Sequence, residues 1–377
     1  MMDPYDRYEL MINGRTVKTP VAIASMAGIV DANYVLERKD YAGIAFLGGF
    51  SIDEPAMNAS LIMEEEGRKE FILKDPVEEI KEQVLKLKDT DVIPGINLRG
   101  TNPESFVNIA TAIGKDAIYE IDAHCRQPSM INAGSGEFLL KNTDHLSEII
   151  KSLKELDVTV SVKIRAGVAE DDAELAKLIW KAGADIIHVD LMDFGHAKLR
   201  VIRNSCPLLI IANNSINNFE KMREMLTHGA DIVSLARHSD SETLKNLSES
   251  IAKYADETGW YNSPKQLCRG GDLRSLTFCC KPVKQCPLLP AIKKIGMSPK
   301  EFHDLKVSIV ENTPLASGES TCFGSLAWCC KSSTPCMFRD ISLRKEGLSH
   351  SDYMRYKHRL SEKIMKKIFE EKDEVSC

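Results

Sequence analysis

Short apolar runs alternate with helix-like segments over the first 240 residues, and this alternation limits the possible folds most strongly. Eight runs, rich in β-branched residues, have the length of buried strands: 21–25, 44–47, 92–97, 117–122, 159–164, 186–190, 208–212 and 232–236. Strands covered by helices on both faces of a parallel sheet are expected to be apolar throughout. Five intervening helices are well marked: 75–88, 103–113, 144–156, 170–181 and 218–228.

Eight strand–helix units in about 240 residues match the size of a (β/α)8 barrel. A doubly wound open sheet is the alternative, but it would usually have fewer strands. No glycine-rich dinucleotide fingerprint follows the first strand, which also counts against it. We therefore predict an α/β protein with a (β/α)8 TIM barrel over residues 1–262. A small cysteine-rich metal-binding domain over 263–340 and a basic helical tail over 341–377 are expected to follow.

A repeated pattern of cysteines dominates the region after the barrel. Cys279, Cys280 and Cys286 recur fifty residues later, and one further cysteine precedes each group. Two sets of four thiols match the ligand count of a closed tetrahedral zinc site or a cubane iron–sulfur cluster. The predicted metal ligands are Cys268, Cys279, Cys280, Cys286, Cys322, Cys329, Cys330 and Cys336.

Disulfides are the main alternative for these cysteines. Cytosolic thiols stay reduced, and the N-terminus has neither the basic stretch nor the apolar core of a signal peptide. No run of about 18 apolar residues predicts a membrane span. We expect a cytoplasmic protein with two metal sites, and the choice between zinc and iron–sulfur remains open. Adjacent cysteines leave the connectivity open as well.

The cysteine repeat continues into two predicted helices. Ser298 with Glu301, and Ser349 with Asp352, have the spacing of helix-capping pairs. The second of these helices is basic and carries Leu360, Ile364 and Ile368 on one stripe, as expected of an exposed amphipathic helix.

The two parts of the chain differ in charge. Residues 1–262 carry 29 Lys and Arg against 42 Asp and Glu, whereas residues 263–377 carry 20 against 13. A basic region next to an acidic one suits an anionic partner such as RNA. It equally suits a solvated surface or an acidic protein partner, so charge alone does not identify the partner.

Polar residues gather at the ends of the predicted strands, where such barrels carry their active sites. The loops after the last two strands could bind phosphate through backbone amides. Cys125 follows the fourth strand and is either a buried small hydrophobe or a catalytic thiol. The remaining candidates for a ligand pocket are Ser25, Met26, Ala27, Asn97, Asp122, Lys163, Arg165, Asp190, Asn213, Asn214, Ala236 and Arg237.

Several motifs resemble those of tRNA-dihydrouridine synthases and their archaeal TIM-barrel relatives. They are Ala24-Ser25-Met26-Ala27-Gly28-Ile29-Val30-Asp31, Cys125 with Ala133-Gly134-Ser135-Gly136, Val162-Lys163-Ile164-Arg165 and Ser234-Leu235-Ala236-Arg237. The paired-cysteine repeat resembles the methanogenesis marker 9 domain, a cysteine-rich module of unassigned function.

The first resemblance implies FMN at the mouth of the barrel and hydride transfer to C6 of a uracil ring. It implies that Cys125 protonates C5, that Lys163 contacts the isoalloxazine, and that the Asn213 and Arg237 loops hold the phosphate. Asn97 stands where the family usually has a glutamine. A thiol near its ordinary pKa of about 8.5 is protonated at neutral pH, as this role requires.

The chain departs from the family pattern at several positions. The usual Asn-x-Gly-Cys-Pro is replaced by residues 122–126, from Asp122 to Arg126, and Asp190 occupies the place of a histidine. Asn214 and His238 replace glycines in the phosphate loops.

Two functional hypotheses follow. The chain is either a flavin-dependent reductase or a metal-binding protein with an altered barrel that binds nucleic acid or assists metalloenzyme assembly. For the reductase, the cysteine module either relays electrons from a donor protein to FMN or binds an RNA substrate.

Overall fold

The computed structural model describes residues 8, 10–13, 15–192, 194–203, 205–206, 208–258, 292–293, 296–321, 324–329 and 336–370. The internal contacts divide the chain into two units, Asp3–Ala252 and Lys253–Cys377, with Met1–Met2 grouped with the second. Each unit is described separately. The predicted boundaries after residues 262 and 340 stay predictions.

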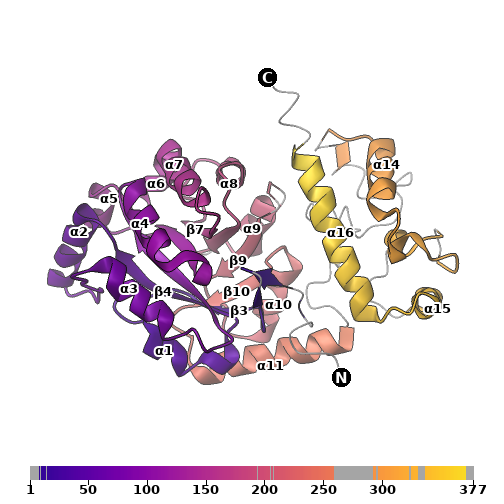
Figure 1. Ribbon diagram of the computed structural model, residues 1–377, viewed down its shortest axis with the longest axis horizontal. Coiled ribbons are helices and arrows are strands. Elements are labelled where there is room, and N and C mark those ends of the chain that lie inside the picture. The colour runs from indigo at the N-terminus through magenta and orange to yellow at the C-terminus, as the bar shows by residue number, and fades with distance from the viewer. Residues whose placement is uncertain are drawn as a thin grey trace. The chain divides into compact units, whose positions relative to one another are not determined.

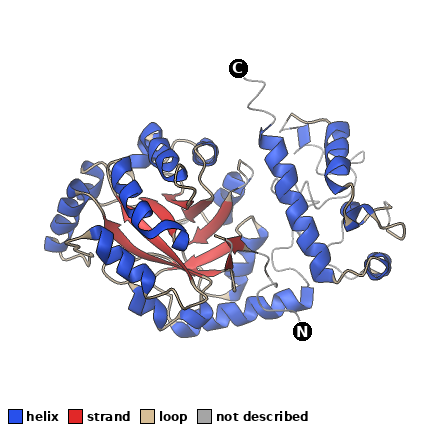
Figure 2. Ribbon diagram, viewed as in Figure 1, coloured by secondary structure: helices blue, strands red, loops and turns tan. Residues whose placement is uncertain are grey.

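Eight parallel strands close into a barrel in the first unit (Figures 1 and 2). They are β3 (Val21–Ile23), β4 (Ile44–Ser51), β5 (Ile93–Arg99), β6 (Ile118–Ala123), β7 (Thr159–Arg165), β8 (Ile186–Asp190), β9 (Leu209–Asn213) and β10 (Ile232–Leu235). Each strand pairs with the next along the chain, and β10 pairs with β3 to close the ring. The predicted (β/α)8 fold is therefore confirmed.

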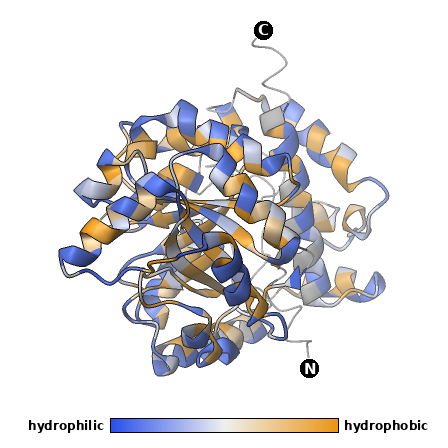
Figure 3. Ribbon diagram, turned by 60° about the vertical axis from the view of Figure 1, so that its left-hand side comes forward, coloured by the Kyte–Doolittle hydropathy of each residue, from blue (hydrophilic) through white to orange (hydrophobic). Residues whose placement is uncertain are grey.

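Helices surround the barrel: α1 (Ala32–Leu36), α2 (Glu54–Glu65), α3 (Pro76–Leu85), α4 (Pro103–Ile113), α5 (Pro128–Asn132), α6 (Phe138–Lys141), α7 (Thr143–Lys154), α8 (Asp172–Lys181), α9 (His196–Arg203), α10 (Phe219–Thr227) and α11 (Ser241–Thr258). Asp53, Asp75, Asn102, Asp171 and Asn218 each cap a helix by accepting a backbone N–H hydrogen bond. The larger helices combine hydrophobic and hydrophilic residues, as one-sided packing on a sheet requires (Figure 3).

Small elements complete this unit. A two-stranded antiparallel hairpin consists of β1 (Met11–Ile12) and β2 (Arg15–Thr16). Short 3-10 turns, Lys39–Tyr41 and Gly114–Asp116, lead into β4 and β6.

The register of the barrel strands decides which polar side chains are neighbours. Asp122 on β6 lies opposite Lys163 on β7, and Arg165 lies opposite Asp190 on β8. Asp190 in turn lies opposite Asn213 on β9. Because the strands are parallel and in step, these residues meet at the carboxyl end of the barrel.

The described part of the second unit is helical. It contains α14 (Pro299–Val310), the 3-10 turns η5 (Pro314–Ala316) and η6 (Leu326–Trp328), α15 (Met337–Lys345) and α16 (His350–Glu370). Ser298 and Glu301 form the predicted capping box on α14. Ser349 and Asp352 bond each other in the same way before α16. Both predicted helix starts are confirmed.

Helix α16 differs from the prediction in its environment. Leu360, Ile364 and Ile368 are each at most 5% exposed, and Tyr353 and Lys357 on the same helix are fully buried. The helix packs against α14, α15 and η5. The expectation of an exposed helix is wrong for this face, because the apolar stripe forms part of the core of the second unit.

Six of the eight predicted metal ligands lie outside the described residues: Cys268, Cys279, Cys280, Cys286, Cys322 and Cys330. The other two, Cys329 and Cys336, are free thiols. Among the described residues, no group of three or more His, Cys, Asp or Glu is arranged to hold a metal. The metal sites therefore stay a prediction.

Within the same described ranges, no helix is both long enough and apolar enough to cross a membrane.

Candidate active site

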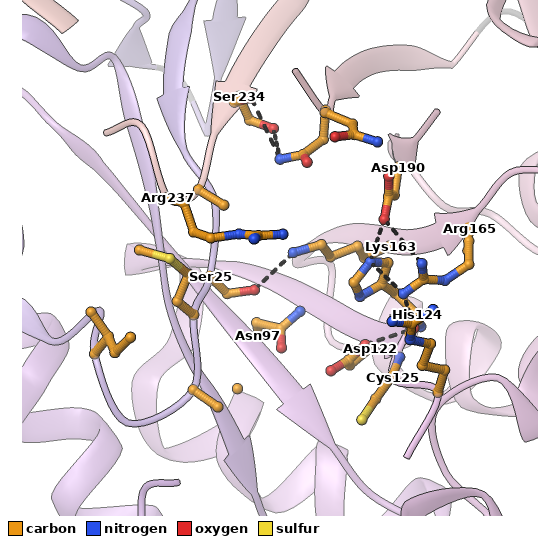
Figure 4. A pocket seen from close by; sticks show the side chains of 18 of the residues that line it. Ser25, Asn97, Asp122, His124, Cys125, Lys163, Arg165, Asp190, Ser234 and Arg237 are labelled. Atoms are coloured by element: carbon orange, nitrogen blue, oxygen red, sulfur yellow. Dashed lines mark hydrogen bonds and ion pairs between the residues drawn. The ribbon is translucent and has the colours of Figure 1, made fainter. Parts of the chain in front are cut away.

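A cavity of 910 Å³ opens at the carboxyl ends of the barrel strands. All the residues predicted from the strand ends line it, although they come from seven different strands or the loops that follow them. They are Ser25, Met26, Ala27, Asn97, Asp122, Cys125, Lys163, Arg165, Asp190, Asn213, Asn214, Ala236 and Arg237. Figure 4 draws the side chains of 18 lining residues and labels ten of them, with Lys163 near the centre of the view.

Lys163 carries an ammonium group inside this cavity. Its side chain is largely buried, and Nζ donates a hydrogen bond to Ser25 Oγ at 3.0 Å. Among the described residues it forms no ion pair with a carboxylate. The cation is therefore fixed in position and available to an anionic or electron-rich ligand.

Arg99 joins two carboxylates on the wall next to β5. Nη1 lies 2.6 Å from Glu70 Oε2, and Nε lies 3.0 Å from Asp122 Oδ2. Burial alone would raise the pKa of Asp122, but Arg99, His124 and Lys163 lower it below its ordinary value. Asp122 is thus held as a carboxylate. Burial raises the pKa of Glu70 despite the same arginine.

A second cluster forms after β6, β7 and β8. Asp190 Oδ2 lies 2.8 Å from His124 Nε2 and 3.5 Å from Arg165 Nη1. Arg165 Nε also lies 2.8 Å from Glu137 Oε1. Burial would raise the pKa of Asp190, but the hydrogen bond and the charge of His124 lower it to about 2. Asp190 is therefore ionised at neutral pH.

Cys125 lies at the edge of the cavity and is only 7% exposed. It belongs to an apolar cluster with Ala56, Ala59, Met63 and Met130. Burial raises the pKa of its thiol, although the charge of Arg99 opposes the shift. Cys125 is therefore packed like a buried hydrophobic residue, and its thiol is protonated at neutral pH.

Backbone contacts fix the loop that carries Cys125. Asp122 Oδ1 accepts the N–H groups of His124 and Cys125, each at 3.0 Å. Glu137 N–H donates to the Cys125 carbonyl at 2.9 Å. Gly136 has φ +64°, and a Cβ there would lie 2.3 Å from the same carbonyl oxygen. Only glycine allows this approach.

The loops after β9 and β10 form the opposite side of the cavity. Asn214 has φ 101° and Ser215 φ 55°, and asparagine tolerates such conformations better than most residues. Asn214 thus adopts a conformation that glycine would adopt easily. No hydrogen bond to a described residue uses the backbone N–H groups of Asn214, Ser215, Arg237 and His238. These amides are available to an anionic ligand.

Sequence comparison places this barrel among known proteins. A family model described as dihydrouridine synthase (Dus) matches residues 82–242. The uncharacterized protein MJ0144 of Methanocaldococcus jannaschii is 33% identical over 244 residues, which cover 61% of this chain and 93% of that protein. The uncharacterized protein MJ0115 of the same organism is 48% identical over 119 residues, 31% of this chain and 77% of that protein. The barrel belongs to the dihydrouridine synthase family.

A solved structure agrees on the fold. DHODH from Eimeria tenella, in complex with ferulenol, superposes with a TM-score of 0.51 at 13% sequence identity, covering 69% of this chain and 87% of that one. At this identity the likeness shows the barrel architecture only. The resemblance of the cysteine repeat to the methanogenesis marker 9 domain stays a prediction.

Two polar residues buried below the cavity, Glu120 and His188, were not among the predicted site residues. Glu120 lies within 2.9 Å of Asn97 Nδ2 and within 2.7 Å of His188 Nδ1. His188 Nε2 in turn lies 2.7 Å from Ser234 Oγ. Burial alone would raise the pKa of Glu120, but His188 and Lys163 lower it below its ordinary value. Burial lowers the pKa of His188 and favours its neutral form.

The sequence contains a pattern that indicates these buried polar residues. Glu120 and His188 stand two residues before Asp122 and Asp190, so each pair lies on one face of its strand. Arg99 likewise stands two residues after Asn97 and was missed. Arg68 and Lys69, which also line the cavity, follow α2 in a loop that no strand-end pattern marks.

Proposed function

We propose that the barrel is an FMN-dependent oxidoreductase that reduces a uracil-like ring. The observation that carries this proposal is the convergence of Lys163, two loops with available backbone amides and Cys125 on one cavity. Membership of the dihydrouridine synthase family supports the same chemistry.

The lining residues fit FMN. The amides after β9 and β10, together with Arg237, would hold the phosphate, since such amides and a guanidinium are good anion donors. Lys163 would lie beside the electron-rich edge of the flavin, with Ser25 and Asn97 as further hydrogen-bonding groups. When bound, FMN supplies the hydride for the reduction.

Cys125 would supply the proton. Its raised pKa keeps hydrogen on Sγ at neutral pH, as a general acid requires. The thiol is nearly buried in its apolar cluster, so substrate binding is expected to shift the loop that carries it. Apo geometry often differs from the reacting geometry in this way.

RNA is the proposed source of the uracil ring. Arg68, Lys69 and Arg126 are exposed, line the cavity and carry positive charge. This rim suits a substrate with phosphates, and the basic region after residue 263 offers a second contact surface. The predicted iron–sulfur clusters would connect FMN to an electron-donor protein, whereas zinc would favour RNA binding.

The first experiment is an absorption spectrum of protein purified without oxygen, before and after reduction by dithionite. Flavin bands that bleach on reduction, with uracil-containing RNA then reduced, are expected. A Lys163→Met variant should retain less FMN than a matched Lys69→Gln variant, because Lys163 is buried in the cavity and Lys69 is exposed. Protein that contains no FMN and takes none up would contradict the proposal and leave the binding or assembly hypothesis.

A further inference from the structure

His124 lies in the cavity wall, directly after β6, in a loop where the family usually has glycine. Its side chain is 26% exposed, and Nε2 is close to Asp190 Oδ2 at 2.8 Å and to Arg165 Nη2 at 3.2 Å. No hydrogen bond to a described residue uses the second ring nitrogen, Nδ1. One nitrogen is therefore oriented by the protein, and the other is available to a ligand (Figure 4).

Three charged groups lie around the ring. The cluster contains two carboxylates, Glu137 and Asp190, and one guanidinium, Arg165. With a neutral imidazole the cluster has a net charge of −1, whereas an imidazolium makes it neutral. The 2.8 Å contact with Asp190 then has a proton on Nε2, and Nδ1 has a second proton to donate.

We propose that His124, oriented by Asp190, donates a hydrogen bond from Nδ1 to the ring carbonyl oxygen that becomes negative during reduction. The inference rests on the proposed reductase function and assigns a residue to a part of that reaction. Arrangements in which a carboxylate orients a histidine toward the reacting group recur in unrelated enzymes.

Hydride and proton add to different carbons of the uracil-like ring. As C6 of the substrate ring gains a hydride, the C5=C6 pair moves to form C4=C5, and the charge collects on O4. The Nδ1–H group of His124 stabilises this enolate oxygen without losing its proton. The enolate then takes the proton of Cys125 Sγ at C5, which restores the carbonyl, and the thiolate regains a proton from water.

Two residues of this cluster differ from the family pattern. Asp190 occupies the place of a histidine at the end of β8, and His124 occupies the place of a glycine after β6. The 2.8 Å contact between them places the imidazole of His124 beside Asp190 in the cavity wall. The cavity wall of this chain therefore contains an imidazole on the loop after β6.

The test uses two ring ligands of similar shape and different charge. Barbiturate is an anion at neutral pH with its charge shared among ring oxygens, as in the enolate, whereas uracil is neutral. Binding of each to the FMN-loaded protein is measured by titration calorimetry. Wild-type protein should prefer barbiturate, and His124→Gln should lower that preference by about tenfold, the typical effect of one charge-assisted hydrogen bond. The glutamine amide can keep the contact with Asp190, so the loop is preserved.

Three further variants separate the explanations. Asp190→Asn should lower the preference for barbiturate because it removes the charge that balances the imidazolium. Lys86→Gln and Lys245→Gln, at exposed lysines that do not line the cavity, should leave the preference largely unchanged. If His124→Gln and Asp190→Asn both keep the wild-type preference for barbiturate over uracil, the inference is overturned while the reductase proposal is left intact. Wild-type protein that binds FMN but neither ring would contradict the uracil-like substrate, and the inference with it.

Discussion

At the scale of single residues, burial determines what the cavity side chains can do. Asp122 and Asp190 are held as carboxylates by nearby cations, while Cys125 is held as a thiol by its apolar surroundings. Acid and base forms thus coexist within a few residues of each other because their environments differ.

The protonation state of Cys125 can be measured directly. Burial raises its pKa, so the reactive thiolate should form only above the ordinary value of about 8.5. Alkylation of the Cys125 peptide, followed by mass spectrometry, should be slow at pH 7 and should accelerate at a higher pH than alkylation of a free thiol such as glutathione. Rapid labelling of Cys125 at pH 7 would show that the thiol is ionised or exposed.

At the scale of elements, Arg99 connects β5 with β6 and with the loop after α2. It is 6% exposed and contacts both Glu70 and Asp122. Arg99→Met would leave two buried carboxylates without their cation, so we expect a loss of about 3–5 kcal/mol in the free energy of unfolding. Arg126→Met, at an exposed position of the same cavity, should change it by less than about 0.5 kcal/mol. Urea unfolding measures both, and equal losses would contradict this account.

Helix α14 offers a second test at this scale. Ser298 caps its first turn by accepting the N–H of Glu301 at 3.2 Å, and Glu301 Oε2 accepts the N–H of Ser298 at 2.6 Å. Ser298→Ala should therefore cost about 1 kcal/mol in the stability of this helix. Ser308→Ala is the matched control, since Ser308 is exposed on the same helix and caps nothing. Thermal unfolding in which the two variants melt alike would rule out a contribution from the cap.

At the scale of the whole molecule, the chain combines a barrel unit with a second unit that contains the cysteine repeat. The two quartets predict two metal sites, as two zinc ions or two iron–sulfur clusters. Metal analysis after anaerobic purification should find both sites occupied in wild type and at least one site lost on replacement of Cys279, Cys280 and Cys286 by serine. Cys206→Ser and Cys377→Ser should retain both. Metal-free wild-type protein would exclude this interpretation of the repeat.

The sequence by itself determined the barrel and the residues at its mouth. Runs such as 159–164 and 186–190 are apolar and β-branched over their full length, and a parallel sheet covered by helices accounts for that pattern. Because function in such barrels lies at the carboxyl ends of the strands, Lys163, Asp190 and Asn213 could be predicted to share a cavity.

Only the tertiary structure decided which of these residues interact. His124 contacts Asp190, and Arg99 contacts Glu70, although the partners are 66 and 29 positions apart in the sequence. Contacts between such distant residues depend on the strand register and on the path of the loops. The sequence also did not predict that Cys125 packs against residues of α2 and α5. Nor did it predict that the apolar stripe of α16 is buried in the second unit. Local pattern fixes which face of a strand or helix a side chain occupies, whereas packing between distant segments sets its partners, its protonation and its exposure.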